Sequence, residues 1–176
     1  MSYADFGRAA ALPPGEYRMP GKWNDRYLVV EGLGEIHRTS FWRGSATGTV
    51  FEGSSVEGSS VEMTKKGAFR TTYFAHDPGG FLLGELTMGG FARRRGVLAW
   101  RGVEYRLQRT GAFREVYSLG RAGTDGILEV RRQGIAGNSH QLTVGHGEPV
   151  DPALALFVMW AVLQIIRQNQ AAASNS

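Results

Sequence analysis

The segment from Ala153 to Leu163 contains no polar side chain, and after Gln164 the apolar run closes with Ile165 and Ile166. A helix on a protein surface has one polar face, so a helix that is apolar all round must be surrounded by lipid or by protein. The run spans 14 residues. A membrane-spanning helix needs about 20 residues, whereas about 10–14 fits a core helix. The segment therefore predicts a helix buried inside the protein.

Nearly all of the chain before this helix has the pattern of short β-strands separated by turn residues. In one of them Val103, Tyr105 and Leu107 share a face, as the two-residue period of a strand requires. About a dozen strands at this spacing indicate an antiparallel meander, and no helical pattern lies between them. The predicted strands are Glu16–Met19, Arg26–Glu31, Glu35–Phe41, Thr47–Glu52, Ser60–Lys65, Ala68–Ala75, Phe81–Thr87, Phe91–Arg94, Val97–Trp100, Val103–Arg109, Phe113–Leu119, Ile127–Arg132 and Gln141–Val144.

The predicted helix covers residues 151–169, with Asp151 as its N-cap and Pro152 at the first helical position. Such a helix is about 28 Å long, close to the roughly 27 Å of an eight-residue strand. It is about 10–12 Å across, which is too wide for an eight-stranded barrel but suits a larger one. The predicted fold class is all-β with one helix: an antiparallel β-barrel of about twelve strands enclosing a C-terminal hydrophobic α-helix.

No linker divides the chain, so we expect one domain over residues 15–169. Residues 1–14, which end in Pro13-Pro14, are expected to be a loose segment, and residues 170–176 a frayed tail. Cysteine is absent, which excludes disulfides, thiolate metal sites and cysteine nucleophiles. The first residues lack the apolar stretch of a signal peptide. These features favour a cytoplasmic protein.

The order of the last strands and the helix resembles the tubby-like superfamily, which includes the tubby C-terminal domain, phospholipid scramblases and LURP-one-related proteins. The segments that carry the resemblance are Gly102–Leu107, Phe113–Leu119, Gly126–Arg132 and Gln141–Val144, followed by the Asp151-led apolar helix. The resemblance covers roughly residues 15–167 and implies a twelve-stranded barrel around a hydrophobic helix. It also implies anionic phospholipid as a partner, because tubby domains bind phosphoinositide headgroups through basic residues. The chain has no cysteine, which scramblase-type palmitoylation needs. It also has no Asp-x-Asp run resembling a calcium loop.

The chain has a net charge of +4 and a pI of about 9.7, a balance typical of proteins that bind nucleic acid or anionic membranes. An arginine bias from a GC-rich genome is an alternative explanation. The basic residues are densest in two groups, Arg93, Arg94 and Arg95 in one and Lys65, Lys66 and Arg70 in the other. Grouped guanidinium and ammonium groups can bind phosphate, so these six residues are the predicted anion-binding site. The alternative is that both groups lie in solvent-exposed turns, where their charges prevent exposed sheet edges from pairing with one another.

No catalytic residue, metal site or cofactor is predicted from the sequence. The four histidines lack zinc-ligand spacing, and there is no Gly-x-Ser-x-Gly motif, P-loop or dinucleotide fingerprint. The predicted function is a non-catalytic binding or interaction module for anionic phospholipid headgroups, peripheral at the cytosolic membrane surface and without a transmembrane span. Two alternatives stay open: a small-molecule enzyme whose site is assembled in three dimensions, and nucleic-acid binding through the basic surface. No protein partner is predicted.

Overall fold

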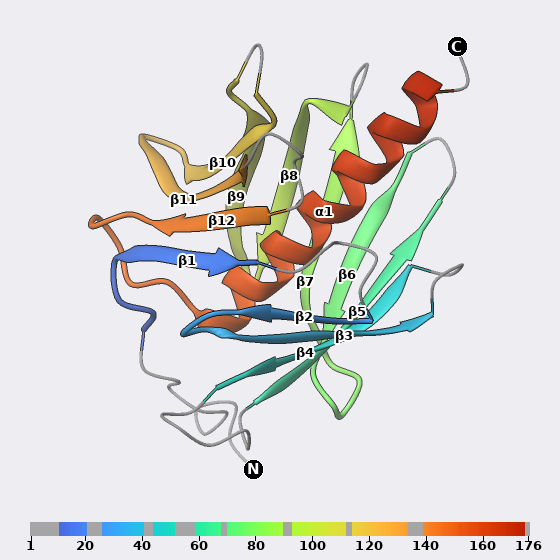
Figure 1. The fold of residues 1–176 in the computed structure, drawn as a ribbon. Coiled ribbons are helices and arrows are strands. Elements are labelled where there is room, and N and C mark those ends of the chain that lie inside the picture. The colour runs from blue at the N-terminus through green and yellow to red at the C-terminus, as the bar shows by residue number, and fades with distance from the viewer. Residues whose placement is uncertain are drawn as a thin grey trace.

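In the computed structural model, one twelve-stranded sheet is followed by one α-helix in the described part of the chain (Figure 1). The structure describes residues 11–20, 26–40, 44–51, 59–67, 70–89, 93–111, 114–133 and 139–174. The elements are β1 (Gly15–Met19), β2 (Tyr27–Val30), β3 (Gly34–Ser40), β4 (Ser45–Val50), β5 (Ser60–Lys66), β6 (Thr72–His76), β7 (Leu82–Gly89), β8 (Arg95–Trp100), β9 (Val103–Arg109), β10 (Val116–Arg121), β11 (Thr124–Gln133), β12 (Ser139–Val144) and α1 (Pro152–Ser174).

The sheet curls into a nearly closed antiparallel barrel. Its strand order is β1-β12-β11-β10-β9-β8-β7-β6-β5-β4-β3-β2, so only β1 pairs out of sequence order, with Gly15 opposite Val144 of β12. The two edges meet where the backbone N–H of Glu31, just after β2, donates to the carbonyl of Arg18 in β1 at 2.8 Å. Because neighbouring strands are antiparallel, all odd-numbered strands run the same way. Their C-terminal ends therefore lie at one end of the barrel.

The barrel wall is shaped to admit α1, which runs through it obliquely in Figure 1. In β4 the buried residues Ala46, Gly48 and Val50 alternate with half-exposed ones, as expected for a wall with one dry face. A Cβ on Gly34 would lie 2.9 Å from Cδ1 of Leu156, and one on Gly48 would lie 3.5 Å from it. The absence of a side chain at Gly34 therefore leaves room both for the carbonyl oxygen of Thr49 in β4, which is the nearest atom, and for Leu156 of the helix.

Residues Pro152–Ile166 of α1 are all buried, including Gln164. This confirms the prediction that the apolar run forms a helix enclosed by the strands. The helix continues to Ser174, past the expected end at residue 169, because Ala171, Ala172 and Ala173 favour helix. The hydroxyl of Ser174 also donates to the carbonyls of Gln170 and Ala171.

The described residues contain no helix apolar enough over sufficient length to cross a membrane.

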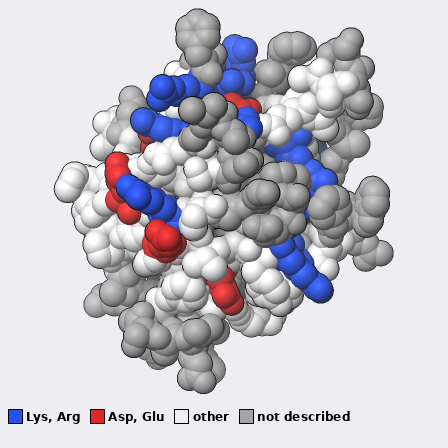
Figure 2. Space-filling view, in the orientation of Figure 1, with Lys and Arg blue, Asp and Glu red and all other residues white. Residues whose placement is uncertain are grey.

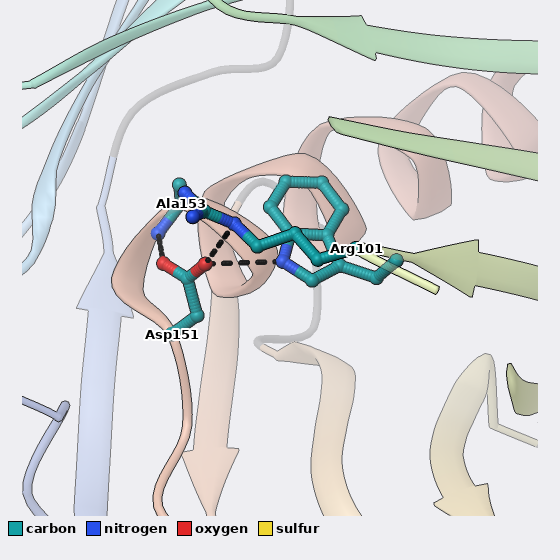
Figure 3. Close-up of polar contacts among 4 residues, drawn as sticks. Arg101, Asp151 and Ala153 are labelled. Atoms are coloured by element: carbon teal, nitrogen blue, oxygen red, sulfur yellow. Dashed lines mark hydrogen bonds and ion pairs between the residues drawn. The ribbon is translucent and has the colours of Figure 1, made fainter. Parts of the chain in front are cut away.

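The N-terminal end of α1 is attached to the barrel through Asp151 (Figure 3). Its Oδ1 accepts a hydrogen bond from the N–H of Ala153 at 2.9 Å, which makes Asp151 the N-cap that the sequence predicts. Its Oδ2 accepts from Nε1 of Trp100 at 3.0 Å and lies 3.3 Å from Nε of Arg101. One carboxylate therefore satisfies the first turn of the helix and joins it to the β8–β9 turn.

Aromatic rings extend this attachment along the helix. The Trp100 ring stacks against Phe157 with centroids 5.6 Å apart, and Phe157 lies 6.1 Å from Trp160. Trp160 in turn meets the edge of Tyr73 in β6 at 5.8 Å. These ring contacts connect the capped end of α1 to Tyr73 in β6.

The predicted strands agree with the observed ones apart from one segment and several boundaries. Val103–Arg109 is β9 with the same bounds. The strand predicted over Phe91–Arg94 is wrong in its described part, because Arg93 has a positive φ of 48° and β8 begins only at Arg95. Residues 1–10, 41, 52, 68, 69, 91, 92, 113, 175 and 176, on which other expectations fall, lie outside the described residues. Leu12, in the segment expected to be loose, is buried and pairs with Val150.

Replacing Asp151 with Ala removes the helix cap and leaves the buried Trp100 indole N–H without its acceptor. We expect the free energy of unfolding to fall by about 2–3 kcal/mol. Urea unfolding followed by circular dichroism measures this. The control is Glu148→Ala, which breaks an exposed ion pair with Arg121 and should change stability by less than about 1 kcal/mol. Equal effects of the two changes would contradict the role given to Asp151.

Trp160→Asp places an unpaired carboxylate among fully buried residues. The free energy of unfolding is expected to fall by more than about 4 kcal/mol, enough to abolish soluble expression. Trp160→Phe should remain folded, because the indole Nε1 has no hydrogen-bond partner among the described residues to lose. Soluble yield and circular dichroism of both variants test this. A folded, soluble Trp160→Asp protein would show that the helix is not enclosed.

Candidate functional site

In each of four strands, the last inward-facing residue is basic. These four residues lie at the same end of the barrel. In β3 the inward residues Gly34 and Ile36 are followed by Arg38, and in β5 Val61 and Met63 are followed by Lys65. In the same way Arg109 follows Leu107 in β9, and Arg132 follows Val130 in β11. These are all odd-numbered strands, so their C-terminal ends lie together.

The same end is where α1 leaves the core. Arg167, Gln168 and Asn169 are the first half-exposed residues of the helix after the buried stretch. The Tyr73 hydroxyl donates to Oε1 of Gln168 at 3.2 Å, and Nδ2 of Asn169 donates to the Tyr117 hydroxyl at 3.3 Å. Two wall strands, β6 and β10, therefore hold the helix where it emerges.

Each of these tyrosines has a basic residue directly opposite it on the neighbouring strand. Lys65 pairs with Tyr73 in the β5–β6 register, and Arg109 pairs with Tyr117 in the β9–β10 register. The bases therefore lie beside the emerging helix and are not scattered over the barrel surface. We call this group the cationic mouth, and it consists of Arg38, Lys65, Arg93, Arg109, Arg132 and Arg167.

Three pairs of charges in the cationic mouth are close enough to repel each other, namely Arg38 with Arg167, Lys65 with Arg167, and Lys65 with Arg93. Burial and then the Arg167 charge lower the pKa of Arg38, which is only 8% exposed. Burial, followed by the charges of Arg167 and Arg93, lowers the pKa of Lys65. Burial also lowers the pKa of Arg167. Arginine nonetheless stays protonated in proteins, so these groups remain a concentrated, partly desolvated positive charge.

The one ion pair between described residues at the cationic mouth joins Arg132 to Glu115, with Nη1 and Oε2 3.0 Å apart. Other acids pair elsewhere, such as Glu129 with Arg131 on the outer face of β11. On the face drawn in Figure 2, Lys and Arg lie mainly along the top and right, the side where α1 emerges in Figure 1. Most acidic side chains on that face lie to the left and below.

The predicted arginine turn does not present its three side chains together. Arg93 is half-buried, and its Nε is a buried donor without a hydrogen-bond partner among the described residues. Its charge lowers the pKa of Lys65, after burial and Arg167, so the two predicted groups do meet at this point. Arg94 and Arg95 are exposed, and Arg95 begins β8 opposite Gln108.

The predicted lysine group is likewise divided by the pleat of β5. Lys65 faces inward, whereas Lys66 faces outward with its Nζ 5.5 Å from the centre of the Phe74 ring. Arg70 is exposed at the β5–β6 connection. The structure thus brings Lys65 and Arg93 into the cationic mouth and leaves Lys66 and Arg70 on its outside.

Sequence reasoning missed Arg38, Arg109, Arg132 and Arg167. A usable signal was present, because each of the three strand residues lies two positions after an inward apolar residue. Adjacency in sequence does not bring these residues together, since neighbouring residues in a strand point to opposite faces. Among the described residues, no group of three His, Asp or Glu is placed to hold a metal ion.

His140 in β12 faces inward near the cationic mouth, opposite Arg132 and Met19 on the adjoining strands. It is buried, and neither ring nitrogen has a hydrogen-bond partner in the described structure. Burial, and secondly the Arg132 charge, lowers its pKa from 6.5 to about 4. The imidazole is therefore neutral in the folded protein at ordinary pH.

This low pKa predicts acid destabilisation. Between pH 6.5 and 4 the unfolded chain protonates this imidazole and the folded protein does not, so stability is full above pH 6.5 and falls as the pH is lowered. The slope is about 1.4 kcal/mol per pH unit, or about 3 kcal/mol over the range. Urea unfolding of wild type and His140→Leu at several pH values isolates the effect. Identical pH dependence in the two proteins would contradict it.

Comparisons with protein-family models, curated protein sequences and solved structures find no match to this chain. The arrangement of the residues themselves is therefore what indicates a function. That arrangement is a cationic mouth, built by inward-facing strand residues around the emerging end of a buried helix.

Proposed function

We propose that this protein is a non-catalytic binding module whose cationic mouth binds the phosphate groups of anionic phospholipid headgroups at the cytosolic membrane surface. The observation that carries the proposal is the convergence of inward-facing bases from β3, β5 and β9 on the exposed turn of α1. Bases without a binding role usually point into solvent at separate positions. Here they share one end of the barrel.

A bound anion would relieve the repulsion among these bases. Guanidinium groups donate paired hydrogen bonds that match the geometry of phosphate oxygens. Partial burial of Arg38 and Lys65 weakens solvent screening, so that each contact with an anion is stronger than on an open surface. The Nε atoms of Arg93 and Arg109 are buried and have no hydrogen-bond partner among the described residues, so they are further donors for an anion that enters the cationic mouth.

The fold adds support to the same proposal. A twelve-stranded barrel around a C-terminal apolar helix is the architecture that the tubby-like resemblance implies, and headgroup binding is the function that it implies. The apolar helix is used to fill the barrel. Attachment to a membrane would accordingly depend on the surface, and chiefly on its charge.

The test is sedimentation with vesicles that contain phosphoinositide, at low and high salt. Lys65→Gln/Arg109→Gln removes two bases of the cationic mouth. Each base near an anionic surface contributes about 1 kcal/mol, so vesicle affinity at low salt should fall about thirtyfold. High salt should weaken wild-type binding as well, because it screens exposed charge.

The matched control is Arg18→Gln/Arg106→Gln. It removes the same charge from exposed outward positions, one of them on the same strand as Arg109. Its affinity should stay near that of wild type. Equal losses in the two variants would show nonspecific attraction without a site. Failure of wild type to sediment even at low salt would overturn the headgroup proposal.

A further inference from the structure

The Lys65 side chain lies in a confined position at the cationic mouth. A Cβ on Gly44 would lie 3.0 Å from Cε of Lys65 and 3.5 Å from its Nζ, so the side chain lies across this glycine on the neighbouring β4 end. On the other side, Lys65 is paired with Tyr73 of β6. The residue is half-exposed, so its side chain is partly covered and still reachable.

The groups that face Lys65 are positive or neutral. Arg93 lies before β8, and Arg167 belongs to α1. Tyr73 is kept as the neutral phenol, because burial raises its pKa strongly. No ion pair joins Lys65 to a carboxylate within the described ranges. The ammonium form therefore lacks a compensating negative charge there.

These surroundings increase the fraction of neutral, nucleophilic amine relative to an exposed lysine. Burial, then Arg167 and Arg93, lowers the pKa of Lys65. A lysine desolvated beside other cations is the arrangement that activates an amine toward carbonyl compounds. The same arginines attract an anionic reactant to the amine. Lys66, the next residue, is exposed on the outer face, so it is neither desolvated nor placed beside these arginines.

We propose that Lys65 is a nucleophilic amine that captures phosphate-bearing aldehydes as an imine in the cationic mouth. The neutral Nζ adds to the carbonyl carbon, and a proton passes from nitrogen to the carbonyl oxygen to give a carbinolamine. Loss of water then forms the C=N bond. No oxidant or reductant is consumed. This activity goes beyond headgroup binding and requires no membrane.

The probe is pyridoxal 5′-phosphate, with borohydride added to reduce any imine to a stable secondary amine. Only three lysines occur in the chain, Lys22, Lys65 and Lys66, so peptide mapping by mass spectrometry can assign every product. At short times we expect labelling of Lys65 to exceed that of Lys66 severalfold. Lys65→Arg should lose most of the label, whereas Lys66→Arg should keep it. Equal labelling of Lys65 and Lys66 would overturn the proposal.

Two further conditions separate reactivity from simple attraction of the phosphate. Pyridoxal, which lacks the phosphate, should label less overall and still favour Lys65; loss of that preference would refute an activated amine. In concentrated guanidinium chloride the preference should disappear, because the unfolded chain has no cationic mouth. A preference that survived unfolding would also refute the proposal.

The test is independent of membrane binding. Imine formation is measured on the wild-type protein in solution without vesicles, and sedimentation is measured on protein that has not been exposed to an aldehyde. Selective labelling in a protein that does not bind vesicles would leave this inference standing and remove the headgroup proposal. Vesicle binding without selective labelling would support the headgroup proposal and overturn this inference.

Discussion

Burial of the first fifteen residues of α1 is the constraint on which the rest of the structure depends. A helix without a polar face is stable in water only if it is surrounded, and the strands that surround it would enclose a void without it. Neither part is stable alone. The mutual dependence explains in part the glycine at position 34, where the wall must approach Leu156 closely. It also explains why the wall needs more strands than a barrel filled by its own side chains.

The two ends of the barrel meet this constraint in different ways. At the first end, Asp151 satisfies the helix N-terminus and joins it to Trp100 and Arg101. At the other end the helix becomes polar at Arg167, and the inward-facing wall residues become polar with it. Arginine and lysine suit this transition, because their stems can cover apolar surface while the charge reaches solvent. A cationic mouth is therefore compatible with the packing of the barrel.

Several features followed from local patterns in the sequence. The apolar run identified the helix, and Asp151-Pro152 identified its start, because capping chemistry depends on residues adjacent in the chain. The bounds of β9 followed from its strict alternation. The segment around Arg93 misled the prediction, since a positive φ there interrupts the strand. The end of α1 was set by the helix propensity of three alanines, not by the loss of apolar side chains.

The sequence by itself determined the fold class, because an unbroken apolar helix after a long β-meander admits few arrangements that bury it. It did not determine the candidate site. Arg38, Lys65, Arg109 and Arg132 are far apart in the chain and come to the same end of the barrel only through strand pairing. Conversely, Lys65 and Lys66 are adjacent and lie on opposite faces. Strand register and the closure of the sheet decide which charges meet. Both depend on contacts between distant segments, so only the tertiary structure could place the bases around the emerging helix.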